Sequence, residues 1–231
     1  MKVIKKKLIS FLERGMRKKA YVVGLRYWAE RAIIELDLHV PDMQVESWSS
    51  VPHMKIKVAE GVYRDYSPTM WDAETKTCSL IIDAGHDGVG SQWVQQLQTG
   101  DIINYVGIGG TPHKVKGKQS IIAIGDESSL GHFIALEQLL GGNKLLPGVI
   151  GFSNPVHAEE CAAYMRTGLS PIRKGTDIDA LANIKDWLAG TPLSDQVIYV
   201  AGSLNMVREM KKFISSMPFF SGTVKGQGFW K

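Results

Sequence analysis

The chain has 231 residues, 44% of them hydrophobic and 22% charged, and a formal net charge of +4. This composition is typical of a globular protein of one or two domains and excludes a largely disordered chain. Apolar runs such as residues 121–124 are too short to cross a bilayer, and no signal peptide is evident. We therefore expect a cytoplasmic protein without a membrane partner. We also expect a monomer, because no long amphipathic surplus is evident.

Neither the charge nor the cysteines indicate a nucleic-acid-binding or metal-binding protein. The basic excess is mild and forms no stripe with interleaved aromatic residues, which argues against nucleic acid as a partner but suits a small anionic ligand. Cys78 and Cys161 are far apart in the sequence, and the six histidines have no metal-ligand spacing. We expect two buried or half-buried free thiols and no catalytic metal.

The first half of the sequence predicts short β-strands. In residues 31–40, Ile34, Leu36 and Leu38 alternate with polar residues, which is the pattern of a strand with one buried face. Turn residues separate this segment from the others. We expect six strands, at residues 20–28, 31–40, 53–58, 63–67, 77–83 and 102–107, and one helix at residues 92–98. This pattern predicts a six-stranded antiparallel barrel within residues 1–113.

The second half alternates between strands and helices. We expect strands at residues 119–124, 145–152, 196–201 and 220–225, and helices at residues 127–140, 157–164, 177–189 and 203–215. Strands that alternate with helices of this length indicate a parallel sheet with helices on both faces. An α/β domain is therefore predicted over residues 114–231. Such sheets bind ligands at the carboxyl ends of their strands.

A first candidate site consists of Arg64, Tyr66 and Ser67. Residues two apart on a strand share a face, so Arg64 and Tyr66 should point together, with Ser67 at the end of the strand. A guanidinium can bind a pyrophosphate, a phenol ring can lie along a flavin, and a hydroxyl can bond a ring nitrogen. The same residues also suit an ordinary barrel strand with a surface arginine and a half-buried tyrosine.

A second candidate site is the turn before the predicted helix at residues 92–98. It contains His86, Gly88, Gly90 and Ser91. The glycines free the backbone, and we expect Ser91 to cap the helix, whose first N–H groups would suit a phosphate. A plain loop with an N-cap, and a structural role for His86, explain the same residues.

A third candidate site follows the first strand of the α/β half and contains Gly125, Asp126, Glu127 and Ser128. A nicotinamide dinucleotide would bind at this end of the strand. Only one glycine is present, so the three-glycine dinucleotide fingerprint is absent. A second strand end, at residues 201–204, has the same small-residue character and opens another helix.

These motifs, in this order, resemble those of the siderophore-interacting proteins, a family of ferredoxin-NADP reductase-like flavoproteins. The resemblance covers roughly residues 17–231 and includes the terminal motif at residues 226–230, Gly-Gln-Gly-Phe-Trp. It implies a flavin-binding barrel with non-covalent FAD, followed by a nucleotide-binding domain for NADH or NADPH. The implied activity is an oxidoreductase that reduces ferric siderophores or other iron chelates and so releases iron.

The resemblance also implies roles for individual residues. Arg64 would bind the flavin pyrophosphate, while Tyr66 and Ser67 would contact the flavin as the catalytic pair. Lys225 would contact the siderophore, although it also suits an ordinary surface lysine; further basic candidates are Lys55, Lys114, Lys116 and Lys118. The remaining cofactor-binding candidates are His86, Gly88, Gly90, Ser91, Gly125, Asp126, Glu127, Ser128 and Trp230.

The sequence departs from the family pattern at two places that concern the cofactors. Thr69 stands where family members often have a second arginine, so pyrophosphate binding should be weaker or should depend on other residues. The second strand of the α/β half is followed by residues 153–155, Ser-Asn-Pro, with neither an acid for a ribose hydroxyl nor an arginine for a 2′-phosphate. The sequence therefore does not choose between NADH and NADPH.

Two other functions fit the same residues. One is an NAD(P)H–flavin electron carrier that serves a different acceptor, such as a quinone or a protein. The other is a non-enzymatic module that binds a nucleotide or an iron chelate. Ferredoxin is a further candidate partner, as an electron donor in place of the nicotinamide. Copurification of FAD would separate the enzymes from the module.

Overall fold

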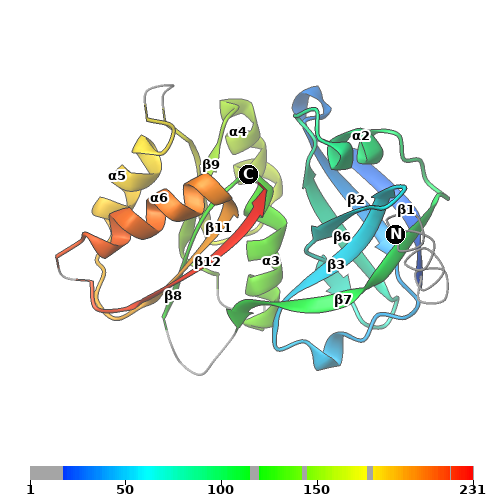
Figure 1. Cartoon of the computed structure of the whole chain (residues 1–231), viewed down its shortest axis with the longest axis horizontal. Helices are drawn as coiled ribbons and strands as arrows, with labels where there is room; N and C mark the ends of the chain where they lie inside the picture. Colours follow the sequence, from blue (N-terminus) through cyan, green and yellow to red (C-terminus); the bar gives the residue numbers. More distant parts are fainter. Residues whose placement is uncertain (1–17, 115–119, 142–144, 176–178, 219, 231) are drawn as a thin grey trace, which may run out of the picture. The chain divides into compact units, whose positions relative to one another are not determined.

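The computed structural model describes residues 18–114, 120–141, 145–175, 179–218 and 220–230. The chain divides into two compact units, each with its own sheet (Figure 1). The first unit contains residues up to Trp48 and Pro52–Gly110. The second contains Ser49–Val51 and the chain from Thr111 onward.

The first unit contains a seven-stranded sheet with the strand order β4-β3-β7-β1-β2-β6-β5. Antiparallel pairings join β1 to β2 and β7, β2 to β6, β3 to β4, and β5 to β6. The elements are β1 (Lys18–Tyr27), η1 (Ala29–Arg31), β2 (Ile33–His39), η2 (Val45–Ser47), β3 (Ser50–Ala59), β4 (Val62–Tyr66), β5 (Thr69–Asp72), β6 (Thr77–Asp83), α2 (Val89–Gln95) and β7 (Ile102–Lys114).

One hydrophobic core fills the space enclosed by this sheet. Ile34, Leu36 and Leu38 of β2 are fully buried, as their alternation predicts, and pack with apolar residues of β1, β3, β6, β7 and α2. Tyr66 of β4 and Trp71 of β5 border the same cluster. All seven strands therefore surround a single core, as in a small barrel filled by side chains.

The second unit contains a five-stranded parallel sheet with the order β10-β9-β8-β11-β12. Its strands are β8 (Ile121–Asp126), β9 (Gly148–Phe152), β10 (Leu169–Arg173), β11 (Val197–Ser203) and β12 (Thr223–Trp230). Its helices are η3 (Glu127–Ser129), α3 (Leu130–Leu139), α4 (Pro155–Tyr164), α5 (Ala182–Ala189) and α6 (Leu204–Ser215).

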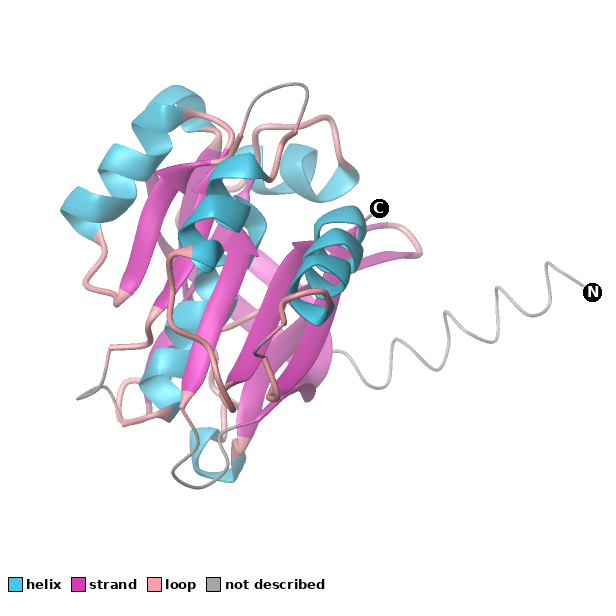
Figure 2. Cartoon of the chain, turned by 90° about the vertical axis from the view of Figure 1, so that its left-hand side faces the viewer, coloured by secondary structure: helices cyan, strands magenta, loops and turns pink. Residues whose placement is uncertain are grey.

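Helices cover both faces of the parallel sheet (Figure 2). Leu188 of α5 and Met210 of α6 belong to one cluster with Ile124 of β8 and Val200 of β11, so α5 and α6 share a face. From β8 the chain adds β9 and then β10 toward one edge of the sheet, and it then crosses back to β11 on the other side of β8. Because such crossovers are right-handed, this change of direction places α3 and α4 on the face opposite α5 and α6. The order reverses between β8 and β11, which makes their carboxyl ends the switch point at which such sheets bind ligands.

The predicted fold class, an antiparallel barrel followed by a parallel α/β domain, is confirmed, with differences in detail. The barrel has one strand more than expected, the four-residue β5, and the α/β sheet contains β10, which the sequence did not predict. Pro171 lies within β10 and argues against a strand, but β10 pairs only with β9 and is an edge strand, where proline is tolerated. The last strand, β12, extends to Trp230 and so contains the terminal motif. No described helix is long and apolar enough to cross a membrane.

Candidate functional site

In the first unit, the predicted flavin-binding strand packs against the start of α2. Arg64 and Tyr66 lie on β4 and share a face, as predicted: a Cβ added at Gly90 of α2 would collide with the Tyr66 hydroxyl and lie 3.4 Å from Cγ of Arg64. Gly90 is therefore required for this close approach. Arg64 and Gly90, which are 26 residues apart in the sequence, thus bring the first two predicted motifs into one cluster.

Tyr66 is a half-buried residue with a protonated hydroxyl. Its ring stacks on Trp93 of α2, with the ring centroids 6.0 Å apart and an angle of 18° between the planes. Burial raises the pKa of Tyr66 to about 12, while the nearby charge of Arg64 acts in the opposite direction. At neutral pH the phenol can therefore donate a hydrogen bond.

The turn before α2 differs from the prediction in one respect. The helix begins at Val89, and Gly88 rather than Ser91 occupies the N-cap position. The prediction that Ser91 caps the helix is wrong: Ser91 lies in the first turn, and its hydroxyl is 3.1 Å from Nε2 of His86. The Gly88 N–H donates to Nδ1 of His86 at 3.0 Å. The His86 ring therefore contacts both the N-cap residue and the first turn of α2.

The groups around this cluster differ in their availability to a ligand. Arg64 is exposed, and one of its N–H groups donates to the Tyr63 carbonyl at 2.9 Å; a guanidinium has five such donors. Ser67 follows β4 and is half-buried. Thr69, at the position of the expected second arginine, is fully buried, and within the described residues its hydroxyl has no hydrogen-bond partner. Position 69 therefore offers no group for a pyrophosphate.

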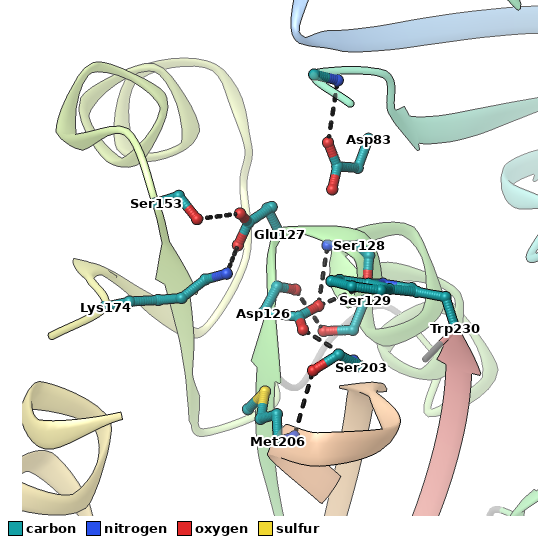
Figure 3. A network of polar contacts seen from close by, with 11 residues as sticks. Asp83, Asp126, Glu127, Ser128, Ser129, Ser153, Lys174, Ser203, Met206 and Trp230 are labelled. Atoms are coloured by element: carbon teal, nitrogen blue, oxygen red, sulfur yellow. Dashed lines mark hydrogen bonds and ion pairs between the residues drawn. The ribbon is translucent and has the colours of Figure 1, made fainter. Parts of the chain in front are cut away.

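In the second unit, the carboxylate of Asp126 joins the ends of β8 and β11 (Figure 3). Oδ1 accepts hydrogen bonds from the N–H and hydroxyl of Ser128 at 3.1 and 2.5 Å, and Oδ2 accepts one from the Ser203 N–H at 2.9 Å. Burial raises the pKa of Asp126, and the hydrogen bonds oppose that rise. Both oxygens are thus bound by internal donors, so the predicted contact between Asp126 and a nucleotide stays a prediction.

Two further hydrogen bonds lie near Asp126, at the carboxyl end of β8. The Trp230 indole N–H donates to the Ser128 hydroxyl at 3.2 Å, which connects the end of β12 to the turn after β8. Gly125 leaves room for the Ser129 hydroxyl, which donates to the Asp126 carbonyl at 2.7 Å. The predicted residues Gly125, Asp126, Ser128 and Trp230 therefore lie together.

Glu127 takes part in a separate interaction that the sequence did not predict. Its Oε2 forms an ion pair with Nζ of Lys174 at 2.7 Å, and its Oε1 accepts a hydrogen bond from the Ser153 hydroxyl at 2.7 Å (Figure 3). Ser153 follows β9 and Lys174 follows β10. The interaction was missed because β10 was missed: without that strand, nothing in the sequence places Lys174 at this edge of the sheet.

Two buried histidines lie beside β12. Nδ1 of His113 and Nε2 of His132 are 2.7 Å apart, and Nε2 of His113 is 3.1 Å from the Lys225 carbonyl oxygen. Because a carbonyl only accepts, Nε2 of His113 carries the proton, and its Nδ1 accepts from His132. Burial, as the largest effect, lowers the pKa of His113 to about 4, so this ring is neutral at pH 7. It also stacks on Tyr199, at 4.2 Å between ring centroids.

The predicted substrate lysines have different environments. The Lys225 ammonium lies 5.5 Å from the ring centroid of Tyr199. Lys55 forms an ion pair with Asp65 at 3.1 Å, and Lys114 is exposed. Two further candidates, Lys116 and Lys118, lie outside the described residues. A role for Lys225 in substrate binding stays a prediction.

Comparisons with known proteins find similar three-dimensional structures but no similar sequences. No protein-family model matches the sequence, and none of the curated proteins matches it. A siderophore-interacting protein from Acinetobacter baumannii has a similar structure, with a TM-score of 0.70 at 15% identity over 93% of this chain and 89% of that one. The ferredoxin reductase of carbazole 1,9a-dioxygenase matches with a TM-score of 0.72 at 16% identity, over 92% of this chain and 69% of that one. The chain has the ferredoxin-reductase-like fold.

A third structure with the ferredoxin-reductase-like fold is similar over almost its whole length. The siderophore-interacting protein SipS from Aeromonas hydrophila has a TM-score of 0.68 at 13% identity, with 93% of this chain and 98% of that chain covered. The family resemblance predicted from the sequence motifs is thus matched by a resemblance of structure. At these identities the comparison shows the fold, while the roles of individual residues stay predictions.

Within this ferredoxin-reductase-like fold, the predicted site residues form two groups, one in each unit. The first surrounds Tyr66 and the start of α2, and the second lies at the carboxyl ends of β8 and β11. Across the described ranges, no three His, Cys, Asp or Glu side chains are grouped so that they could hold a metal ion. The residues that sequence reasoning missed are Ser153, Lys174, His113 and His132, and the residues next to them in the sequence give no signal of a site.

Proposed function

We propose that the protein is an FAD-dependent oxidoreductase that reduces ferric siderophores with electrons from NADH or NADPH. The observation that carries this proposal is the packing of Arg64 and Tyr66 against Gly90 of α2, within a chain that has the ferredoxin-reductase-like fold. This cluster combines a guanidinium, a phenol and the N–H groups of a glycine-containing turn. Such groups suit a ligand with both an aromatic ring system and a pyrophosphate.

The residues present in the first unit fit FAD. Arg64 is exposed and has N–H donors for the pyrophosphate, and the protonated Tyr66 hydroxyl can donate to the ribityl or ring. Ser67 offers a hydroxyl to a ring nitrogen, and the turn from His86 to Ser91 would hold the adenosine side. When bound, FAD would accept two electrons as a hydride and pass them on one at a time. Because position 69 holds a threonine and not an arginine, Arg64 would be the main cationic contact.

The second unit supports a nicotinamide dinucleotide site. The sheet order reverses between β8 and β11, and ligands of such sheets bind at this switch point. Ser128 and Glu127 follow β8, while Gly202 and Ser203 end β11. Gly202 has no side chain, which lets the backbone of β11 lie close to the Asp126 carboxylate. In this proposal Trp230 lies beside the same edge through its bond to Ser128.

The proposed substrate is a ferric siderophore in the cytoplasm, with iron as substrate and not as a resident cofactor. Reduction releases iron because hydroxamate and catecholate oxygens hold ferrous iron less tightly than ferric iron. Lys225 would contact the anionic chelate, and its ammonium already lies against the Tyr199 ring. We propose a monomer as the working form.

The proposal is tested by the visible absorption spectrum of the purified protein. We expect a flavin spectrum that bleaches when NADH or NADPH is added without oxygen and returns when a ferric siderophore is added. A spectrum that recovers only with a quinone or an oxidised ferredoxin would instead identify an electron carrier. A colourless protein that takes up no added FAD would refute the proposal in favour of a non-enzymatic binding module.

Arg64→Ala is expected to weaken FAD binding by about 1.5–3 kcal/mol, tenfold or more, because one charge-assisted contact with the pyrophosphate is lost. The dissociation constant is measured by titrating the apoprotein with FAD and following flavin fluorescence. Arg31→Ala is the matched control, since Arg31 is also exposed in the first unit but lies over Tyr27. Equal affinity in both variants would remove Arg64 from the site.

A further inference from the structure

The carboxylate of Glu127 is held at the end of β9, although Glu127 itself follows β8. Ser153, the first residue after β9, donates its hydroxyl to Oε1, and Lys174, the first residue after β10, pairs with Oε2, each at 2.7 Å. β9 is the second strand of the sheet in chain order. The end of the second strand is where dinucleotide-binding sheets place an acid that bonds the ribose 2′-hydroxyl. Glu127, which follows the first strand, thus places a carboxylate at the end of the second strand, where residues 153–155 contain no acid.

This arrangement is built into the surrounding fold. The Lys174 side chain crosses β9 at Gly151, where an added Cβ would lie 2.7 Å from Cγ of Lys174. The side chains of Glu127 and Lys174 are only 13% and 19% exposed. An ion pair buried to this extent is costly to break, because the partner left behind keeps its charge in a place with little water. Glu127 is therefore a fixed anion at this position.

We infer that the chain selects NAD(H) over NADP(H), and that Glu127 is the residue that makes the selection. This inference rests on the proposed nicotinamide site of the second unit. A carboxylate has about four lone-pair positions. Oε2 is buried beside Lys174, so Oε1, which accepts one hydrogen bond from Ser153, is the oxygen left to accept from a ribose hydroxyl of NAD(H). The 2′-phosphate of NADP(H) adds up to two negative charges at the same position.

A 2′-phosphate has no favourable way to bind there. If the ion pair stays intact, the Lys174 charge is already neutralised by Glu127, so the phosphate loses water without gaining a cation of its own. If the phosphate takes Lys174 for itself, Glu127 loses its cation while it remains largely buried. Both routes cost affinity for NADP(H), and neither affects NAD(H). We expect NAD(H) to bind at least tenfold more tightly.

The test is the binding of NAD⁺ and NADP⁺ to the FAD-loaded protein, measured by isothermal titration calorimetry. The oxidised forms are used because they do not reduce the flavin, so the readout is affinity and not turnover. The wild type should prefer NAD⁺ at least tenfold. Glu127→Gln keeps the shape of the side chain but removes its charge and frees Lys174 for a phosphate, so the preference should shrink tenfold or reverse.

Two further variants separate this effect from general changes in charge or folding. Glu159→Gln removes the same charge from an exposed position on α4 and should keep the wild-type preference. Lys174→Met keeps the carboxylate but removes the cation, so discrimination against NADP⁺ should persist or grow. Circular dichroism confirms that each variant is folded.

The outcomes distinguish this inference from the proposed function. NADP⁺ binding to the wild type as tightly as NAD⁺ would overturn the inference alone, as would an unchanged preference in Glu127→Gln. A gain of NADP⁺ affinity in Lys174→Met would also overturn it. Binding of neither nucleotide to the wild type would overturn the proposed nicotinamide site and this inference together.

Discussion

Gly202→Ala is expected to destabilise the second unit by about 3–5 kcal/mol. Gly202 has φ +140°, a conformation that is strained for any residue with a side chain, and an added Cβ would lie 2.5 Å from Oδ2 of Asp126. The methyl group would push the buried carboxylate away from the Ser203 N–H. The cost is therefore the backbone strain plus the loss of a hydrogen bond to a charged group.

The matched control for this substitution is Gly141→Ala. Gly141 also has a positive φ, +92°, but nothing lies within 4 Å of its added Cβ, so only the backbone strain of about 1–3 kcal/mol applies. Hydrogen–deuterium exchange of the amides in β8 and β11 measures the difference within the second unit. Equal loss of protection in the two variants would show that the carboxylate of Asp126 does not hold these strands together.

The free energy of unfolding of the second unit is expected to fall by up to about 3 kcal/mol as the pH is lowered from 6.5 to about 4. Burial lowers the pKa of His113 from 6.5 to about 4, so in this window the unfolded chain binds a proton that the folded chain does not. The folded state therefore carries no penalty from His113 above pH 6.5, and its free energy of unfolding falls as the pH is lowered toward 4. Urea unfolding at several pH values, followed by the helical circular dichroism signal, measures this slope.

Two variants isolate His113 from the carboxylates that also titrate in acid. His113→Gln removes the titrating ring, so the unfolding free energy should depend less steeply on pH between 6.5 and 4. Tyr199→Phe removes the hydroxyl that donates to the Lys114 carbonyl at 2.6 Å and leaves the histidine in place. It should lower stability by a similar amount at each pH. A slope in His113→Gln as steep as that of the wild type would contradict the prediction.

The fold could be predicted because its main signals are local. Alternation in β2 and the continuous apolar runs of β8 and β11 identify strands from neighbouring residues alone. Strand β10 could not be predicted in this way, because Pro171 argues against a strand unless the strand is known to lie at an edge. Edge position is a property of the assembled sheet, which a single segment of sequence does not contain.

The candidate site could be predicted only in part, for a similar reason. The proximity of Arg64 and Tyr66 follows from the period of a strand. The position of Gly90 against Tyr66, by contrast, depends on how α2 packs on β4. The N-cap was misplaced by three residues, because serine is a common capping residue and Gly88 was read only as part of the turn. The partners of Glu127 come from two other strands, so no local pattern reports them.

The two separate hydrophobic cores affect how any stability measurement on this chain is interpreted. One cluster belongs to the barrel and another to the α/β sheet, and a chain with two cores does not have to melt in a single cooperative transition. Four of the six tryptophans belong to the first unit, while Trp187 and Trp230 belong to the second. Tryptophan emission therefore reports mainly on the barrel, and a single melting temperature taken from it would not describe the α/β half.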